Sequence, residues 1–336
     1  MASFYSLNRR QCMSAALAAP AVLQSRWALA QAQDFPSRPI KVTVPFAPGG
    51  SVDQMARHIG GKLLPKWGQP LVVESRPGAN SLVGTAFAAK APADGYNILM
   101  AADPAFSIIP LLNKNMPYNP DKDFAPLSIM CQISFLIVAH GSFPANNFQE
   151  MVAYAKANPG KVSYSTPGIG SQHHVLFEVL AARLGIELLH IPYQGIAPSM
   201  AALLSGEVNL LMGALALPLP HVRTGRIKAL AFAGNERHPL LPQVPTVHQA
   251  GGLAFEARSW FGAFAPAGTP KDIVQKLSND IWEITSSKDY SENYLIPNGY
   301  DPVNHVTPAQ FGRFLAEDRS RWEKSIALVP PDKLKT

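Results

Sequence analysis

Two features are missing or scarce in this chain of 336 residues. No segment approaches the roughly 20 consecutive apolar residues that cross a bilayer, so no membrane insertion is expected. Only two residues are cysteines, Cys12 and Cys131. With 47% hydrophobic residues, the chain must instead be stabilised by an apolar core, and its length suffices for one large or two medium domains.

The first thirty residues have the layout of a secretory signal peptide. Arg9 and Arg10 precede an alanine-rich apolar run over residues 13–23. Ala28-Leu29-Ala30 offers a cleavage site of small residues, with Ala30-Gln31-Ala32 as a second choice. The paired arginines also favour the twin-arginine export type. We therefore expect residues 1–30 to be removed and the mature protein to be periplasmic.

Removal of this leader changes the charge and the cysteine count. The formal net charge falls from +6 to +3, because the leader contains Arg9, Arg10 and Arg26 and no acidic residue. A mild charge without a basic run gives no reason to expect nucleic-acid binding. Cys131 then stands alone and cannot form an internal disulfide. Its place in the apolar run 129–138 predicts a buried side chain.

Short apolar segments alternate with helical patterns along the mature chain. Strands are expected at 40–44, 71–74, 97–101, 134–139, 162–165, 188–191, 208–212 and 227–233, and helices from residue 51, at 82–90, at 148–157, from the Ser171 turn to Gly185, and at 198–204. This alternation predicts an α/β fold with doubly wound parallel sheets. Because the pattern restarts after residue 139, two α/β units are expected, and two such halves can close on a ligand by hinge motion.

Each unit contains a glycine-rich turn between a strand and a helix. The first turn covers residues 45–50, and Ser51 with Gln54 has the spacing of a capping box. The second turn covers residues 166–171. Glycines allow close approach of the backbone to a ligand, and a helix start favours an anion. An anion site is therefore expected where the two turns face each other.

Several enzyme and metal motifs are incomplete. The segment Gly168-Ile169-Gly170-Ser171-Gln172-His173 begins like a dinucleotide fingerprint, but a histidine stands where the last glycine is needed. A hydrolase built on Ser171, His174 and Asp53 lacks the nucleophile elbow. We therefore expect neither an enzyme nor a cofactor.

A metal site is not expected either. His174 and Glu178 are four residues apart, yet they supply only two of the three or four ligands that zinc requires. We expect His174 to cap its helix and Glu178 to be solvated. Trp260 and Phe261 are expected in hinge or core packing.

A set of ordered motifs carries a family resemblance. They are Pro45-Phe46-x-Pro48-Gly49-Gly50-x-x-Asp53-x-x-Ala56-Arg57, Arg76-Pro77-Gly78-Ala79, Ala93-Asp94-Gly95-Tyr96, Tyr154-Ala155-Lys156-Ala157-Asn158-Pro159-Gly160-Lys161, Gly168-Ile169-Gly170-Ser171-x-x-His174, Ile191-Pro192-Tyr193-x-Gly195, Val244-Pro245-Thr246, Trp260-x-Gly262 and Ala265-Pro266-Ala267-Gly268-Thr269-Pro270. In these motifs the chain resembles the Bug-type substrate-binding proteins of tripartite tricarboxylate transporters, over about residues 35–330.

The resemblance implies a type II periplasmic binding protein fold with two α/β domains joined by two crossing strands, near 134–139 and 259–264. Domain 1 would comprise residues 35–136 and 262–330, and domain 2 residues 137–261. The two turns would hold a ligand carboxylate, largely through backbone groups and ordered water. The implied ligand-binding residues are Phe46, Ala47, Pro48, Gly49, Gly50, Ser51, Asp53, Asp103, Thr166, Gly168, Gly170, Ser171, His174, Tyr193, Gln194 and Gly213.

The implied function is the capture of a small carboxylate by a monomeric periplasmic protein and its delivery to a membrane permease. A binding protein that acts on a sensor kinase is an alternative, and a secreted hydrolase is a second one.

Two departures from the family pattern bear on the ligand. Relatives often carry Lys in place of Gln194, and an Asp-Ser or Asp-Asn pair in place of Gly213-Ala214. The far side of the pocket is therefore expected to be neutral and roomy. Phe46, Phe106 and Tyr193 are expected either to line it or to pack in the core. A bulky or aromatic carboxylate, such as an aromatic dicarboxylate, is predicted over aspartate, glutamate or citrate.

Overall fold

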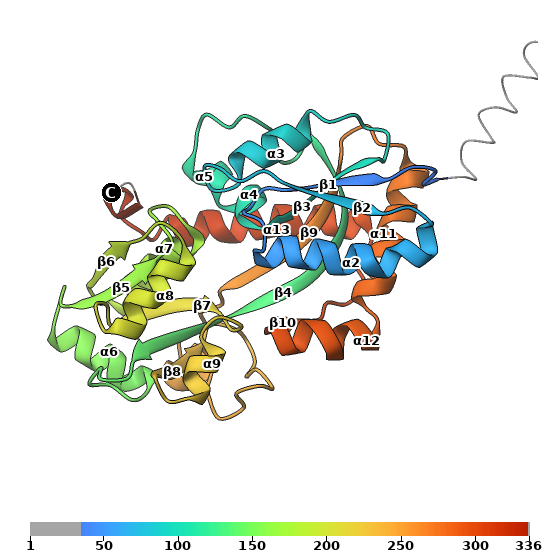
Figure 1. Ribbon diagram of the computed structural model, residues 1–336. Helices are drawn as coiled ribbons and strands as arrows, with labels where there is room; N and C mark the ends of the chain where they lie inside the picture. Colours follow the sequence, from blue (N-terminus) through green and yellow to red (C-terminus); the bar gives the residue numbers. More distant parts are fainter. Residues whose placement is uncertain (1–34, 335–336) are drawn as a thin grey trace, which may run out of the picture.

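In the computed structural model, which describes residues 35–334, strands and helices alternate in two successive units (Figure 1). The first unit comprises β1 (Ile40–Val44), α2 (Ser51–Trp67), β2 (Leu71–Ser75), α3 (Leu82–Ala89), β3 (Asn97–Ala102), α4 (Pro104–Ser107) and α5 (Ile109–Leu112). The long strand β4 (Phe124–His140) leads out of this unit. The expected bounds of β1 are confirmed, and those of β2, α3 and β3 differ by one residue.

The second unit is built in the same way. It comprises α6 (Phe148–Ala157), β5 (Val162–Thr166), α7 (Gln172–Leu184), β6 (Leu188–Pro192), α8 (Ile196–Ser205), β7 (Leu210–Ala214), α9 (Leu219–Arg223), β8 (Ile227–Phe232) and α10 (Val247–Gly251). The chain then returns through β9 (Arg258–Pro266), α11 (Lys271–Thr285), α12 (Lys288–Tyr290), a π-helical turn (Ser291–Leu295), a 3-10 turn (Ile296–Asn298), β10 (Tyr300–Asp301), α13 (Pro308–Ile326) and a last 3-10 turn (Pro331–Leu334).

Strand β4 connects the two units. Its first part, residues 124–134, pairs with β9, and its second part, residues 135–140, pairs with β7 and β8. The strand order is β2-β1-β3-β9-β4-β7-β5-β6, with β8 and β10 also paired to β4. Figure 1 shows β4 running through the molecule from one half to the other.

The sheet is mixed rather than parallel throughout, which corrects the expectation. The pairs of β1 with β2 and β3, and of β5 with β6 and β7, are parallel as expected. Strands β4 and β9 are antiparallel to each other and to their other neighbours β3 and β7. The reason lies in the chain path: β9 returns from the second unit and lies between β3 and β4, antiparallel to both, and β4 enters the second unit antiparallel to β7.

The cores follow the apolar patterns of the sequence. In α2 the side chains of Val52, Met55, Ala56, Ile59 and Leu63 are all buried, which is the stripe that helical spacing predicts. Cys131 is free and fully buried, as expected, and burial raises the pKa of its thiol. Trp260 is also fully buried, and its ring packs on the rings of Phe106 and Phe311.

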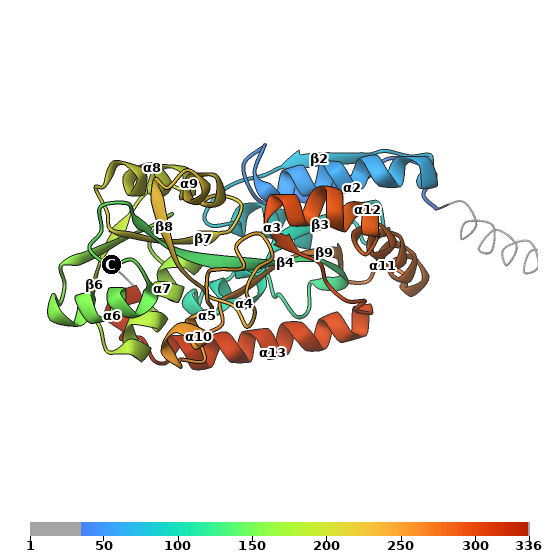
Figure 2. The same ribbon diagram turned by 90° about the horizontal axis from the view of Figure 1, so that it is seen from below.

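The carboxyl-terminal segment returns to the first unit, as the resemblance implies. Helices α11 and α13 pack against β4, and α11 also packs against α2. Helix α13 additionally contacts α7 of the second unit. Figure 2 shows α13 lying along one side of the molecule, away from α2. Its amino terminus has a capping box formed by Thr307 and Gln310.

The capping box expected at Ser51 is wrong. Gly50 is the N-cap of α2 and Ser51 is the first helical residue. The Gln54 side chain donates to the Gly49 carbonyl at 2.8 Å, and the Asp53 carboxylate accepts from the Gly49 N–H at 3.0 Å. The physical reason is that the helix begins one residue earlier, so the Gln54 N–H, which a Ser51 cap would serve, already donates to the Gly50 carbonyl at 2.9 Å.

The expected leader, residues 1–30, lies outside the described residues. Among residues 35–334, no helix has the length and apolar character that crossing a membrane requires. We propose the division into residues 35–136 with 262–330 and residues 137–261, since β4 changes its partners between Ser134 and Phe135.

Candidate ligand-binding site

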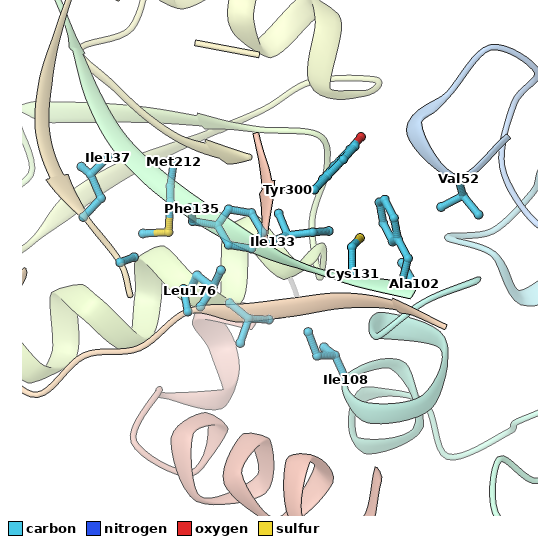
Figure 3. Packing of buried hydrophobic residues seen from close by; sticks show 14 of the residues in the cluster. Val52, Ala102, Ile108, Cys131, Ile133, Phe135, Ile137, Leu176, Met212 and Tyr300 are labelled. Atoms are coloured by element: carbon cyan, nitrogen blue, oxygen red, sulfur yellow. The ribbon is translucent and has the colours of Figure 1, made fainter. Parts of the chain in front are cut away.

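A cavity of about 580 Å³ lies where the two units meet. It is lined by Phe46, Ala47, Gly50, Ser51, Val52, Asn80, Ser81, Ala102, Pro104, Ile109, Ile133, Phe135, Gly170, Ser171, Gln172, His173, Gly195, Ile196, Ala214, Ala216, Leu217, Ser259, Phe261 and Tyr300. Figure 3 shows the Tyr300 ring extending from β10 near Ile133 and Phe135 of β4, with Val52 across from it.

The starts of four helices of eight or more residues border this cavity, besides those of the short helices α4 and α5. The lining includes the N-cap residues of α2 and α3, which are Gly50 and Ser81. It also includes the first residues of α7 and α8, which are Gln172 and Ile196. The first N–H groups of a helix have no acceptor within the helix, and the helix dipole makes this end positive. The four starts therefore supply hydrogen-bond donors for an anion.

The cavity walls carry no formal charge. None of the lining residues, all of which belong to the described part of the chain, is Lys, Arg, Asp or Glu. The one titratable ring among them near neutrality is His173, and burial lowers its pKa to about 4, so it is neutral at pH 7. Aromatic surface comes from Phe46, Phe135, Phe261 and Tyr300. An anion with an apolar body is the chemistry that this combination suits.

The first turn is held in shape by Asp53. Its carboxylate accepts from the Gly49 N–H, from Ser75 Oγ at 3.0 Å, and from the Arg57 guanidinium at 2.9 and 3.0 Å. The Arg57 hydrogen bond is the main cause that lowers the Asp53 pKa. Gly49 has φ 78°, a conformation that favours glycine. Asp53 thus holds the first turn in shape through these hydrogen bonds and does not itself line the cavity.

The second turn is held by Ser171 and His174. Ser171 Oγ donates to the Gly168 carbonyl at 2.6 Å and accepts from the His174 N–H as the N-cap of α7. His174 Nδ1 accepts from the Gly170 N–H at 3.1 Å, so its side chain holds the turn. The expectation that His174 caps the helix is wrong, because Ser171 is the N-cap. Because Ser171 and His174 are engaged with the backbone and Asp53 with Arg57, the three do not form a hydrolase triad.

Glu178 is not solvated, which corrects the expectation. It is buried, and its Oε1 accepts from the Tyr164 hydroxyl at 2.5 Å. The reason is that α7 is covered on several sides, so even its polar positions face other elements. Among the described residues, no group of three His, Cys, Asp or Glu side chains could hold a metal ion.

The sixteen residues implied by the resemblance fall into three groups. Phe46, Ala47, Gly50, Ser51, Gly170 and Ser171 line the cavity. Pro48, Gly49, Asp53, Thr166, Gly168 and His174 lie in or next to the same turns, and Asp103 follows β3 and accepts from Gln172; none of these seven is a lining residue. Tyr193, Gln194 and Gly213 do not line the cavity either, although the following residues Gly195 and Ala214 do.

Phe106 and Tyr193, two of the aromatic residues expected either to line the pocket or to pack in the core, do not line it. The Phe106 ring stacks on Phe264 with 3.9 Å between the centroids and is fully buried in the core of the first unit. The Tyr193 hydroxyl donates to Glu207 Oε1 at 2.8 Å. Phe135, Phe261 and Tyr300 form the aromatic wall in their place. Their positions depend on strand pairing between β4, β9 and β10, for which the sequence has no local motif.

The cavity between two α/β units, bordered by helix starts, is the arrangement of a solute-binding protein of the type II periplasmic binding fold. The chain belongs to the tripartite tricarboxylate transporter receptor family, whose model matches residues 55–329. The expected fold class and the resemblance stated from the motifs are thereby confirmed. The members of this class bind solutes and are not enzymes.

Individual relatives agree with this assignment. The chain is 36% identical over 292 residues to the protein BugT of Bordetella pertussis, covering 87% of this chain and 89% of the relative. An R. palustris protein solved with adipate is 30% identical, with a TM-score of 0.81, and covers 88% of this chain and 98% of its own. MatC of Rhodopseudomonas palustris, solved with bound malate, is 29% identical with a TM-score of 0.77, covering 87% and 100%.

Proposed function

We propose that this protein binds a small carboxylate with an apolar, aromatic-sized body and delivers it to the membrane permease of a tripartite transporter. The observation that supports the ligand class is the cavity itself, which combines four helix starts with walls that carry no formal charge. Two relatives solved with adipate and malate, both carboxylates, are in line with this proposal. Delivery to a permease rests on the family.

The first and second turns hold the carboxylate in this proposal. Backbone N–H groups at the starts of α2 and α7 donate to its oxygens, with Ser51 and Ser171 beside them. Four helix starts supply more donors than one carboxylate needs, which favours a dicarboxylate such as an aromatic one. The aromatic wall of Phe46, Phe135, Phe261 and Tyr300 then packs on the ring.

The uncharged cavity lining also disfavours two other kinds of solute, amino acids and citrate. An amino acid would bring an ammonium into a cavity without an acidic side chain, and a desolvated charge without a partner is costly. Citrate would bring three negative charges against no basic side chain. The volume of about 580 Å³ lies within the range of small-molecule sites.

The ligand class is tested by measuring the melting temperature and then the affinity by titration calorimetry. The panel contains benzoate, benzene-1,4-dicarboxylate, adipate, malate, citrate, glutamate and glucose. A ligand that binds only the folded protein stabilises it by about 2.7 kcal/mol at a hundredfold excess over its Kd. We expect an aromatic acid to give the largest shift. Stronger binding of glutamate or citrate than of every aromatic acid would contradict the proposed ligand class.

Export is tested separately. The periplasmic fraction of an expressing bacterium should contain a chain whose amino terminus is Gln31 or Gln33, as the two cleavage sites predict. Recovery of that fraction with Met1 still present would contradict the proposed processing.

A further inference from the structure

A buried hydrogen bond crosses the cleft beside the cavity. Gln172, the first residue of α7 in the second unit, donates through Nε2 to Asp103 Oδ2 at 2.8 Å. Asp103 directly follows β3 of the first unit. Asp103 is fully buried and Gln172 is 7% exposed. The bond therefore joins the two halves of the molecule where solvent does not compete for it.

Asp103 is fixed by several other contacts, with the connecting strand β9 and with the start of α4. Its second oxygen, Oδ1, accepts from Ser259 Oγ at 2.5 Å, and its N–H donates to the Trp260 carbonyl at 3.1 Å. Its carbonyl accepts from the N–H groups of Phe106 and Ser107, both at 2.9 Å. Oδ2 is thereby left as a rigid acceptor aimed at α7.

Gln172 lies next to the residues that are proposed to hold the carboxylate. It follows Ser171, and both residues line the cavity together with Gly170. The second turn also approaches the first unit at Gly170, where an added Cβ would come within 3.9 Å of Leu112 Cδ1. A bond from Gln172 to Asp103 therefore sets where the start of α7 lies relative to the first turn.

We propose that Asp103 and Gln172 form an interdomain latch, in which Asp103 is a positioning residue that holds the start of α7 in its ligand-binding place. The proposal rests on the proposed function, because the latch matters for binding only if the second turn holds the solute. The latch forms in the closed molecule and breaks when the two units separate. It stabilises closure without selecting among ligands.

Within residues 35–334, the side-chain hydrogen bonds of the Asp103 carboxyl group come from Gln172 and Ser259, and none comes from a cationic side chain. Arg321 instead binds the neighbouring buried carboxylate of Asp318, at 2.5 Å. Burial, and then the charge of Asp318, raise the pKa of Asp103. A neutral acid has nearly the same shape and hydrogen-bonding groups as an amide. Asp103→Asn is therefore the conservative variant, and its amide can serve both Gln172 and Ser259.

The latch is tested by measuring closure without any ligand. Dyes are attached through Lys90→Cys at the end of α3 and Lys156→Cys in α6, two exposed positions in opposite units. Cys131 is buried and will not compete for the label. Single-molecule energy transfer then gives the ratio of closed to open molecules, and circular dichroism checks that each variant is folded.

We expect Gln172→Ala and Asp103→Ala each to lower the closed-to-open ratio by roughly tenfold, as loss of a buried hydrogen bond predicts. Asp103→Asn should stay within about twofold of the wild type. The double variant Asp103→Ala with Gln172→Ala should be no worse than the more affected single variant. Gln275→Ala, an exposed glutamine of α11, serves as the matched control.

Two results would overturn the latch. One is an unchanged ratio in Gln172→Ala, and the other is a double variant whose loss is the product of the single losses. Benzoate and adipate are then added to each variant. If neither binds the wild type while the ratios change as expected, the latch stands and the proposed ligand class fails. If both bind, the latch variants should weaken them by the same factor.

Discussion

His174 lies face to face with His190, with 3.8 Å between the ring centroids and 11° between the planes. His174 Nδ1 accepts from the Gly170 N–H, and His190 Nε2 lies 2.6 Å from Thr166 Oγ1. Both histidines therefore stabilise the second turn through their contacts with Gly170 and Thr166. Burial lowers the pKa of each ring to about 4, and for His190 the neighbouring His174 contributes to this as well.

This pair makes the second turn sensitive to acid. A histidine with a folded pKa of about 4 and an unfolded pKa of about 6.5 binds fewer protons when folded. The contribution of this neutral histidine to the stability of the folded protein is therefore complete above pH 6.5 and is lost as the pH falls toward 4. We expect the free energy of unfolding to drop by at least about 1 kcal/mol between pH 7 and pH 5. Chemical denaturation at a series of pH values measures it.

A matched pair of variants assigns that pH dependence. His190→Gln removes one titrating ring and should flatten the curve between pH 7 and pH 5. His248→Gln changes an exposed histidine of α10 and should leave the curve unchanged. Equal slopes in the wild type and in His190→Gln would show that other groups cause the acid loss.

The glycines of the two turns are expected to be intolerant of bulk. Gly170 has φ 69°, which side chains with a Cβ adopt poorly, and a Cβ on Gly50 would lie 3.2 Å from the Ala47 carbonyl oxygen. Gly50→Val and Gly170→Val should lose carboxylate binding in calorimetry while circular dichroism remains that of a folded protein. Ser171→Ala should cost less, on the order of 1 kcal/mol of binding free energy.

Gly160→Val is the control for backbone strain alone. Gly160 has φ 70°, and nothing lies within 4 Å of an added Cβ, far from the cavity lining. It should therefore reduce stability without reducing affinity. Wild-type affinity in both Gly50→Val and Gly170→Val would refute the proposed contact with the carboxylate.

Much of this site could be predicted from the sequence because each turn is encoded locally. A strand, a glycine pair and a helix stand within sixteen residues at Val42–Arg57, and the same arrangement recurs around Gly168 and Gly170. The opposite wall could not be predicted in this way. Tyr300 belongs to a strand of two residues, β10, and it reaches the cavity only because it pairs with Ile133.

Long-range contacts decided the features that the sequence left open or misplaced. Phe106 packs in the core, the second of its two expected places, because its ring stacks on Phe264, and Tyr193 donates to Glu207. Strand β4 was expected to cover residues 134–139 and begins at Phe124, because pairing with β9 extends it through Pro126 and Ser128. Long-range pairing decides such features, and local periodicity does not record it.

The aromatic wall is expected to select among carboxylates. Phe261→Ala and Tyr300→Ala each remove a ring from the cavity lining. They should weaken benzene-1,4-dicarboxylate by at least about tenfold, since aromatic pairs contribute about 1 kcal/mol beyond the area they bury. The binding of adipate, which has no ring, should be weakened less by the same substitutions. Phe264→Leu, in the core away from the cavity, is the control. It should lower stability without changing the affinity for benzene-1,4-dicarboxylate relative to that for adipate. Equal losses for both ligands would contradict aromatic stacking.

The last prediction concerns the charge of the cavity at Ala214. Gly213 was expected to leave room for the ligand, but Ala214 is the residue that lines the cavity, and a Cβ on Gly213 would instead lie 2.9 Å from Leu211 Cδ2. Ala214→Asp therefore places a carboxylate beside the ligand, where no described lining residue is basic. It should abolish binding of an aromatic dicarboxylate through like charge and desolvation. Ala214→Asn adds nearly the same volume without the charge and should retain most of the affinity, as measured by calorimetry. If Asn and Asp weaken binding equally, volume rather than charge controls this side of the cavity, which would contradict the proposed role of its uncharged lining.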